Sequence, residues 1–218
     1  GVHATYYDLG SFGNQSGRHV SRILPIFNVD TGMTFERNAN LFGNAYLQTL
    51  EPRLFYNYIP TKSQNDLPNF DTSENSFSYN QLFRENLYVG NDRINSANSL
   101  TAAVQTRFFN PNNGAELFRA GIGQKFYFKN DKVLLDGSVG RYERSQSDWV
   151  GFAHGKLSNS IHAGFDVHYN QNESRAESYA ATIRYNPEPG KVLSARYKYG
   201  RNERIYLQSD GNYFYDKI

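Results

Sequence analysis

Hydrophobic and polar residues alternate through the run 100–128, and a turn signal divides this run in two. In Leu100–Phe109 the even positions are mostly apolar, whereas the other face carries Gln105 and Arg107. The segment 110–114, Asn-Pro-Asn-Asn-Gly, is dense in turn formers, because Pro fixes φ and Asn and Gly tolerate positive φ. Apolar alternation then resumes at Phe118, Ala120, Ile122, Phe126 and Phe128. Successive strand side chains point to opposite faces, so the run predicts a hairpin with one apolar and one polar face.

The same period of two recurs on both sides of this hairpin. Further strands are predicted at 2–9, 22–36, 45–59, 161–169, 178–185 and 193–199. Pro52 lies well inside one of them and cannot donate a ladder hydrogen bond, which predicts a bulge or locally weak pairing there. The pattern as a whole predicts an all-β chain of about ten antiparallel strands.

The connections between these strands fall into two classes. Short turns are predicted at 38–44, 110–114, 158–160 and 187–190, and longer connections at 10–20, 60–98, 171–176 and 200–210. The two classes alternate along the chain, and so lie at opposite ends of the sheet, only if 129–148 is a single long excursion. Segment 60–98 is polar with aromatic islands, which predicts an ordered loop that packs on something.

Composition narrows the class of protein further. The 218 residues include 17 Tyr and 16 Phe, no Cys and a net charge of only +2. Aliphatic residues are sparse, and no apolar run approaches the ~20 residues of a membrane-spanning helix. This composition, rich in Tyr and poor in aliphatic residues, favours a sheet with one face exposed to water. The lack of Lys/Arg runs argues against a nucleic-acid partner. The alternation stops abruptly at both ends, so we expect the chain to be a piece of a larger sheet.

The sequence offers few candidate residues for catalysis or metal binding. The sequence has no G-x-S-x-G, Walker A or HExxH motif, and Gly121 and Gly123 lie inside a strand, where glycine relieves crowding. His162, Asp166 and His168 share a strand face, but neighbours there are ~7 Å apart, so a wet face is favoured over a metal site. We therefore expect no enzyme activity, no cofactor and no metal.

Two sets of polar residues remain as candidate sites. The first is a cluster before the central hairpin that is either a structural anchor for the long loop or a solvated loop entry: Asn91, Asp92, Arg93, Asn95 and Asn98. The second lies on polar strand faces and either meets an anionic ligand or merely pairs with acids: Gln105, Arg107, Arg119, Lys125, Arg184, Arg196 and Lys198.

Several ordered motifs carry a family resemblance. They are SRILPIFNVDTGMTFER (21–37), LEPRLFYNYIP (50–60), LPNFDTSENSF (67–77), LYVGNDRINSANSLTAAVQTRFF (87–109) and GAELFRAGIGQKFYF (114–128). Together they resemble the barrel domain of the LptD (Imp/OstA) family of lipopolysaccharide-assembly proteins. The resemblance is strong over 21–128 and is mainly one of strand pattern from 129 to 218.

This resemblance implies the middle part of an antiparallel transmembrane β-barrel of roughly 26 strands in the outer membrane of a Gram-negative bacterium. Residues 60–98 would then be an outer, extracellular loop, and the cluster at 91–98 would anchor it at the barrel mouth. Implied partners are lipopolysaccharide, an LptE-type lipoprotein plug, outer-membrane lipids, and the periplasmic LptA bridge through a jelly-roll domain that lies outside this sequence.

Two alternatives stay open at this stage. Another outer-membrane channel, such as a porin, would show the same alternation but not the motifs of 21–128. A soluble carbohydrate-binding β-sandwich would bury its apolar face against a second sheet, whereas a membrane barrel would present that face to lipid.

Overall fold

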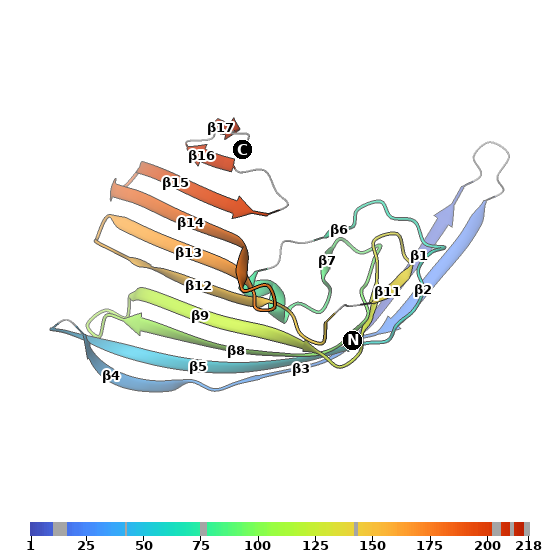
Figure 1. The fold of residues 1–218 in the computed structure, drawn as a ribbon, viewed down its shortest axis with the longest axis horizontal. Coiled ribbons are helices and arrows are strands. Elements are labelled where there is room, and N and C mark those ends of the chain that lie inside the picture. Colours follow the sequence, from blue (N-terminus) through green and yellow to red (C-terminus); the bar gives the residue numbers. More distant parts are fainter. Residues whose placement is uncertain are drawn as a thin grey trace.

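A wide, curved antiparallel sheet forms the body of the molecule (Figure 1). The computed structural model describes residues 1–10, 17–41, 43–74, 78–141, 144–201, 206–209 and 212–215. The sheet has eleven strands in the order β17-β16-β15-β14-β13-β12-β9-β8-β5-β3, with β4 also paired to β5. Their bounds are β3 Phe27–Gly32, β4 Phe35–Leu41, β5 Asn44–Ile59, β8 Ala97–Phe109, β9 Glu116–Tyr127, β12 Trp149–Lys156, β13 Ile161–Asn170, β14 Arg175–Glu188, β15 Lys191–Gly200, β16 Tyr206–Ser209 and β17 Asn212–Tyr215. The all-β antiparallel fold is confirmed, and within the described strands the sheet is open.

The remaining elements lie outside the main sheet. They are the hairpin of β1 (Val2–Leu9) and β2 (Arg18–Pro25), the pair β6 (Ser73–Glu74) and β7 (Tyr88–Val89), the pair β10 (Asp131–Val133) and β11 (Val139–Arg141), and the 3₁₀ helix η1 (Tyr79–Phe83). In Figure 1 the hairpin β1–β2 continues the line of β3 beyond the sheet. Because β10 and β11 pair only with each other, the expected single excursion over 129–148 is confirmed.

The ends of the sheet differ as the loop lengths predicted. Short turns join β8 to β9, β12 to β13 and β14 to β15 at one end of the sheet, the turn end, and the long segments gather at the other, the loop end (Figure 1). The turn predicted at 38–44 is too long, since β4 runs to Leu41 and β5 begins at Asn44. One predicted long connection, 171–176, is instead a compact turn over 171–174, in which the Asn170 side chain accepts from the backbone N–H groups of Asn172 and Glu173. The predicted connections 10–20 and 200–210 are too long, since β2 already begins at Arg18 and β16 occupies Tyr206–Ser209; residues 11–16, 202–205 and 210 lie outside the described part.

The strand predicted over 22–36 is wrong in its bounds, since that stretch holds β2, β3 and the start of β4. The partner changes at Pro25, because β2 pairs with β1 while β3 and β4 pair with β5. Beyond Gly32 the ladder opposite Pro52 is interrupted and resumes at Phe35 in the same register. Weak pairing near Pro52 is therefore confirmed, but it takes the form of a break in the partner strand rather than a bulge.

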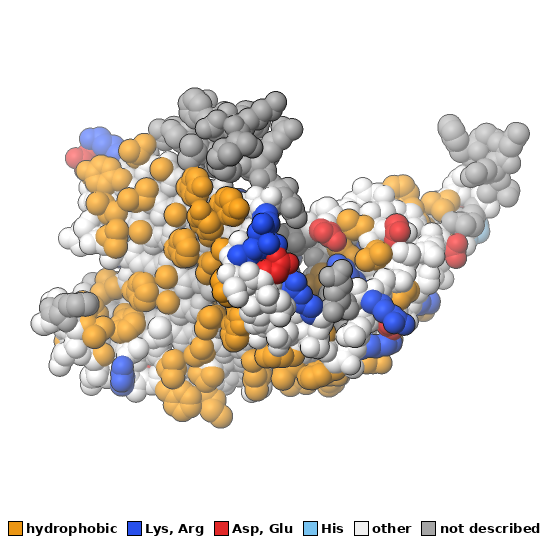
Figure 2. Space-filling view, viewed as in Figure 1, with side chains coloured by type: hydrophobic (Ala, Val, Ile, Leu, Met, Phe, Trp, Pro, Cys, Tyr) orange, Lys and Arg blue, Asp and Glu red, His pale blue; other side chains and the backbone are white. Residues whose placement is uncertain are grey.

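The outer face of the sheet is apolar and exposed. Large side chains on it include Leu50, Leu54, Phe118, Ile122, Phe165, Ile183 and Leu193, each at least 39% exposed. Figure 2 shows hydrophobic side chains spread over the left-hand strands, with most charged ones in this view near the loops. No second sheet packs on this face in the described part of the chain, which contradicts the β-sandwich alternative. Over the same residues, no helix is long and apolar enough to cross a membrane.

The buried core lies under the loops. Leu24, Ile59 and Ile94 form one cluster, and Leu82 of η1 is fully buried against the inner face of the sheet. The Thr101 hydroxyl donates to the Leu82 carbonyl at 2.7 Å, which fixes η1 on the wall. Gly123 permits this contact, because a Cβ there would lie 2.8 Å from both the Leu82 Cδ1 and the Ala103 Cβ. Crowding thus explains this glycine, as its position inside a strand predicted.

We expect Gly123→Ala to destabilise the folded protein by about 1–3 kcal/mol, because the added methyl overpacks the contact between η1 and the wall. The measurement is urea unfolding of the full-length protein in detergent. Gly10→Ala is the matched control, since a Cβ at Gly10 has nothing within 4 Å. Equal stabilities for the two variants would contradict the close packing of η1.

Candidate functional site

Asp92 is a buried carboxylate at the loop end of the sheet. The Tyr7 hydroxyl donates to one of its oxygens at 2.5 Å, and the backbone N–H groups of Phe70 and Asp71 donate to the other at 2.6 and 2.9 Å. Burial alone would raise the pKa of Asp92, but these hydrogen bonds stabilise the charged form and hold its pKa below the ordinary 3.8. Asp92 therefore ties the hairpin β1–β2 to the segment 66–74.

Arg22 on β2 is a second residue that connects the hairpin β1–β2 to the long loop, and it is only 1% exposed. Its guanidinium donates to the backbone carbonyls of Asp92 at 2.6 Å and Asn91 at 2.8 Å, and to the Gln64 side chain at 2.5 Å. Gln64 in turn bonds both the N–H and the C=O of Ile94, at 3.2 and 2.6 Å. The charge of Arg22 is thus spread over several carbonyl groups rather than matched by one carboxylate.

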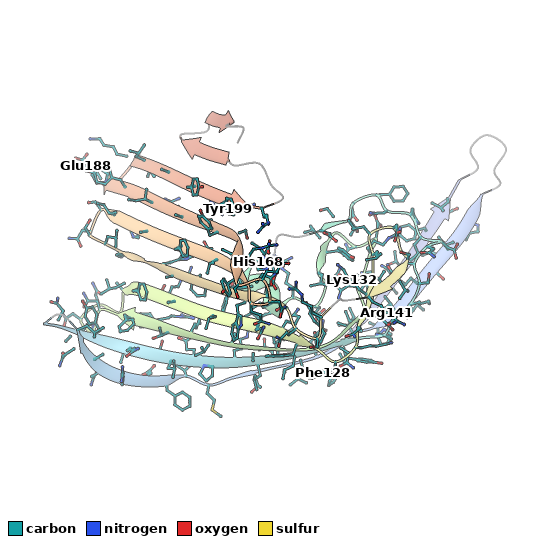
Figure 3. The ribbon with its side chains drawn as sticks, in the orientation of Figure 1. Phe128, Lys132, Arg141, His168, Glu188 and Tyr199 are labelled. Atoms are coloured by element: carbon teal, nitrogen blue, oxygen red, sulfur yellow. The ribbon has the colours of Figure 1, made fainter. Side chains whose placement is uncertain are left out.

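Arg93 joins the two long loops to each other. Its guanidinium donates to the carbonyls of Leu67 at 2.7 Å, Pro68 at 2.9 Å and Leu135 at 2.9 Å. Tyr88 donates to the Val133 carbonyl at 2.6 Å, and burial raises its pKa to about 12. The segments 60–74, 78–96 and 129–141 form one unit, which we call the loop cap; Figure 3 labels Lys132 and Arg141 on it.

The predicted cluster is only partly brought together. Asp92, Arg93 and Asn95 are buried within the loop cap, where the Asn95 side chain accepts from the Leu87 N–H at 2.6 Å. Asn91 is exposed and joins through its backbone. Asn98 lies apart on β8, where its side chain accepts from the Tyr56 hydroxyl at 3.0 Å.

Sequence reasoning missed Tyr7, Arg22 and Gln64, which complete this network. Tyr7 and Arg22 bond Asp92 directly, from 85 and 70 positions away. Gln64 lies 28 positions from Asp92 and is linked to it through Arg22. Single polar residues at such separations carry no local pattern.

Most predicted contacts on the polar strand faces lie on the inner, concave side, and many are already paired. Gln105 and Arg107 both bond Glu51, at 2.6 and 3.1 Å. Arg119 lies 3.6 Å from Glu116 and also faces the Phe152 ring. Lys125 is 3% exposed beneath the loop cap. The remaining three are Arg184, Arg196 and Lys198, and they line cavities on the concave wall.

Two cavities open on this wall. The larger, of about 1210 Å³, lies between η1 and strands β12–β15 and is lined by acids and arginines in equal number, with two histidines and one lysine. His168, labelled in Figure 3, bonds Asp148 at 2.9 Å, and His154 approaches Asp166 at 3.3 Å. Asp166 and His168, which share a strand face, thus turn to different partners. The smaller cavity, of about 680 Å³, lies nearer the turn end.

Asp92→Asn should loosen the loop cap, because the amide keeps one acceptor oxygen for three donors and loses the charge. We expect the local opening free energy at Phe70 and Asp71 to fall by about 1–3 kcal/mol. Since folding lowers the pKa of Asp92, its stabilisation is present above pH ~3.8 and is lost as pH falls through the folded pKa. The measurement is hydrogen exchange of these two amides against pH, corrected for intrinsic rates.

Asp8→Asn is the matched control, since Asp8 is exposed and contacts only the exposed His19 among the ion pairs described. The role of Asp92 is contradicted if its variant keeps the protection and the pH profile of the parent protein.

Comparison with known proteins identifies the family to which the chain belongs. The family model described as "LPS transport system D" (LptD) matches residues 1–218. Curated relatives named "LPS-assembly protein LptD" are 67% identical in Neisseria meningitidis serogroup A, 66% in Neisseria gonorrhoeae and 43% in Azoarcus, and cover 100%, 100% and 93% of this chain. The chain spans about 27% of the length of the Neisseria relatives. This open, two-faced antiparallel sheet therefore belongs to the LptD family of the Gram-negative outer membrane, as part of its barrel domain.

Proposed function

We propose that the whole protein assembles lipopolysaccharide into the outer leaflet, and that this chain supplies middle wall and outer loops of its barrel. The family match over the entire chain carries the proposal. It also sets aside a porin, which would share the alternation of faces but not the family. The mechanism is translocation, so no bond is made or broken.

The two faces of the sheet support this mechanism. Lipopolysaccharide has a polar saccharide and apolar acyl chains, and it therefore needs a hydrated path beside a lipid-facing wall. The concave face offers hydrated polar and charged side chains, and the outer face offers exposed apolar ones. The inner residues Gln105, Arg107, Arg119, Arg184, Arg196 and Lys198 are then candidates for contact with the substrate, and Lys125 supports the loop cap.

The loop cap has a distinct place in this proposal. It is an ordered lid on the outer rim, and Asp92, Arg93 and Asn95 anchor it together with Arg22. An LptE-type plug and the LptA bridge, reached through the jelly-roll domain, are the further partners that the family suggests. They would act on the lumen and on the periplasmic side, respectively.

Depletion of the full-length protein should stop newly made lipopolysaccharide from reaching the cell surface, while its synthesis continues. The measurement is pulse-labelled lipopolysaccharide, scored by reaction with an impermeant reagent on intact cells. Re-expression of the wild-type gene is the control. Undiminished surface arrival in depleted cells would contradict the proposed function.

Single cysteines in the full-length protein test the orientation. Ser73 in the loop cap and Asn113 at the turn end are both exposed, so each gives an accessible thiol on one side of the membrane. We expect an impermeant maleimide to label Ser73→Cys but not Asn113→Cys on whole cells. Both should be labelled after permeabilisation, which controls for reactivity. Labelling of Asn113→Cys on intact cells would invert the orientation, and failure at Ser73→Cys would contradict an outer loop cap.

A further inference from the structure

Backbone register sets a row of residues side by side across five strands of the concave wall. Arg119 pairs with His154, His154 with Gly164, Gly164 with Thr182, and Thr182 with Arg196. Directly opposite residues in an antiparallel sheet share a face, with Cβ atoms ~4.5–5.5 Å apart. The row therefore brings side chains from β9 to β15 onto one transverse strip.

A cavity of about 680 Å³ opens over this strip. Gly164 forms part of its floor, and a Cβ there would lie 2.9 Å from the His154 Cδ2, so the missing side chain lets the histidine ring lie across the strand. Arg184 lines the same cavity from the next row, diagonal to Arg196, at a Cβ separation of roughly 7–8 Å. Long side chains bridge such a distance, so the two guanidinium groups can meet on one ligand.

The charge of this cavity is unbalanced. Three arginines line it (Arg119, Arg184 and Arg196) against one acid, Asp166, which already approaches His154 at 3.3 Å. Arg119 has Glu116 nearby at 3.6 Å. Arg184 and Arg196 have neither an ion pair nor a side-chain hydrogen bond with any residue whose side chain the structure describes.

Other cations of the concave wall differ in this respect. Arg107 is paired with Glu51, and Arg144 and Arg175 are paired with Asp148, Glu173 and Glu177. Those ion pairs lie in the larger cavity, or toward the β8–β9 hairpin, and leave little net charge there. Arg184 lines the smaller cavity and Arg196 lines both, so these two arginines meet where the cavities adjoin, toward the turn end of β14 and β15.

We infer that Arg184 and Arg196 form a binding site for a phosphate group on the inner wall. Guanidinium forks match the planar spacing of phosphate oxygens, and two of them would neutralise a phosphomonoester dianion. Thr182 and Ser194, which also line the cavity, add hydroxyl donors. The volume leaves room for the sugar that carries the phosphate, since cavities of ~300–1,000 Å³ hold ligands of drug size.

The identity of the ligand rests on the proposed function. If the whole protein carries lipopolysaccharide, a phosphate on its sugar head is the group that reaches this wall. An anionic phospholipid headgroup has the same chemistry, so the test separates the two sources. The position near the turn end, which is the periplasmic end in the proposed orientation, puts the site early on the path.

The test uses the full-length protein with its plug in detergent, and compares Arg184→Gln/Arg196→Gln with the parent protein. The probes are phosphorylated lipopolysaccharide, the same lipopolysaccharide after enzymatic dephosphorylation, and phosphatidylglycerol, with binding measured by thermophoresis. We expect the double variant to bind phosphorylated lipopolysaccharide about tenfold or more weakly, with no change for the dephosphorylated form. Arg184→Lys/Arg196→Lys keeps the charge without the fork and should fall between.

Arg37→Gln/Lys191→Gln removes the same charge from exposed positions outside the cavity and should bind like the parent protein. Equal binding by the double arginine variant, or an equal loss for both forms of lipopolysaccharide, overturns the site. A loss confined to phosphatidylglycerol overturns its assignment to lipopolysaccharide. If the parent protein binds no lipopolysaccharide at all, the proposed function fails instead, so the two failures are distinct.

Discussion

The structure depends on one constraint: each strand must keep its apolar side chains on one face through many successive pairings. Opposite residues stay on the same face across β5, β8, β9, β12, β13, β14 and β15, from Leu54 facing Ala102 to Ile183 facing Ala195. A slip of one residue at any ladder would turn a whole strand over. Even the break opposite Pro52 preserves the register, which shows how strictly the two faces are kept apart.

The loop cap is stabilised by a different kind of interaction. Its order comes from a few buried polar groups that satisfy backbone atoms at long range, with a small apolar cluster beside them. Arg22 and Arg93 each bind several carbonyls, and Asp92 takes up N–H groups from a neighbouring turn, so irregular backbone is satisfied without a ladder. Truncating any one of these partners leaves buried groups unpaired, which is why such a network holds a long loop in a single conformation.

Alternation predicted most of the wall, because a period of two is a local signal that each strand repeats. It gave the strands around 45–59 and 100–128 closely and sorted the arginines of β8, β9, β14 and β15 onto the inner face. It failed at 22–36, because a change of pairing partner divides this stretch into separate strands, which strand propensity does not reveal. It also failed at 171–176, where the Asn170 side chain closes a tight turn. The anchor was only half predicted, since Asp92 and Arg93 lie in a polar motif while Tyr7, Arg22 and Gln64 are isolated in sequence.

The contacts of the loop cap also have a consequence for the order of folding. Arg22 bonds residues 42 to 70 positions away, and the Gln64 N–H meets the Gly137 carbonyl at 2.9 Å. Each of these closures carries the entropy cost of a long loop, whereas the hairpins β8–β9, β12–β13, β13–β14 and β14–β15 form between neighbours in sequence. The pairings β5–β8 and β9–β12 differ from these hairpins, because each closes one of the long segments of the loop cap, so we expect the loop cap and this part of the wall to form together. Contacts within the loop cap thus lower the entropy cost of these two wall pairings, and the pairings in turn bring the segments of the loop cap together.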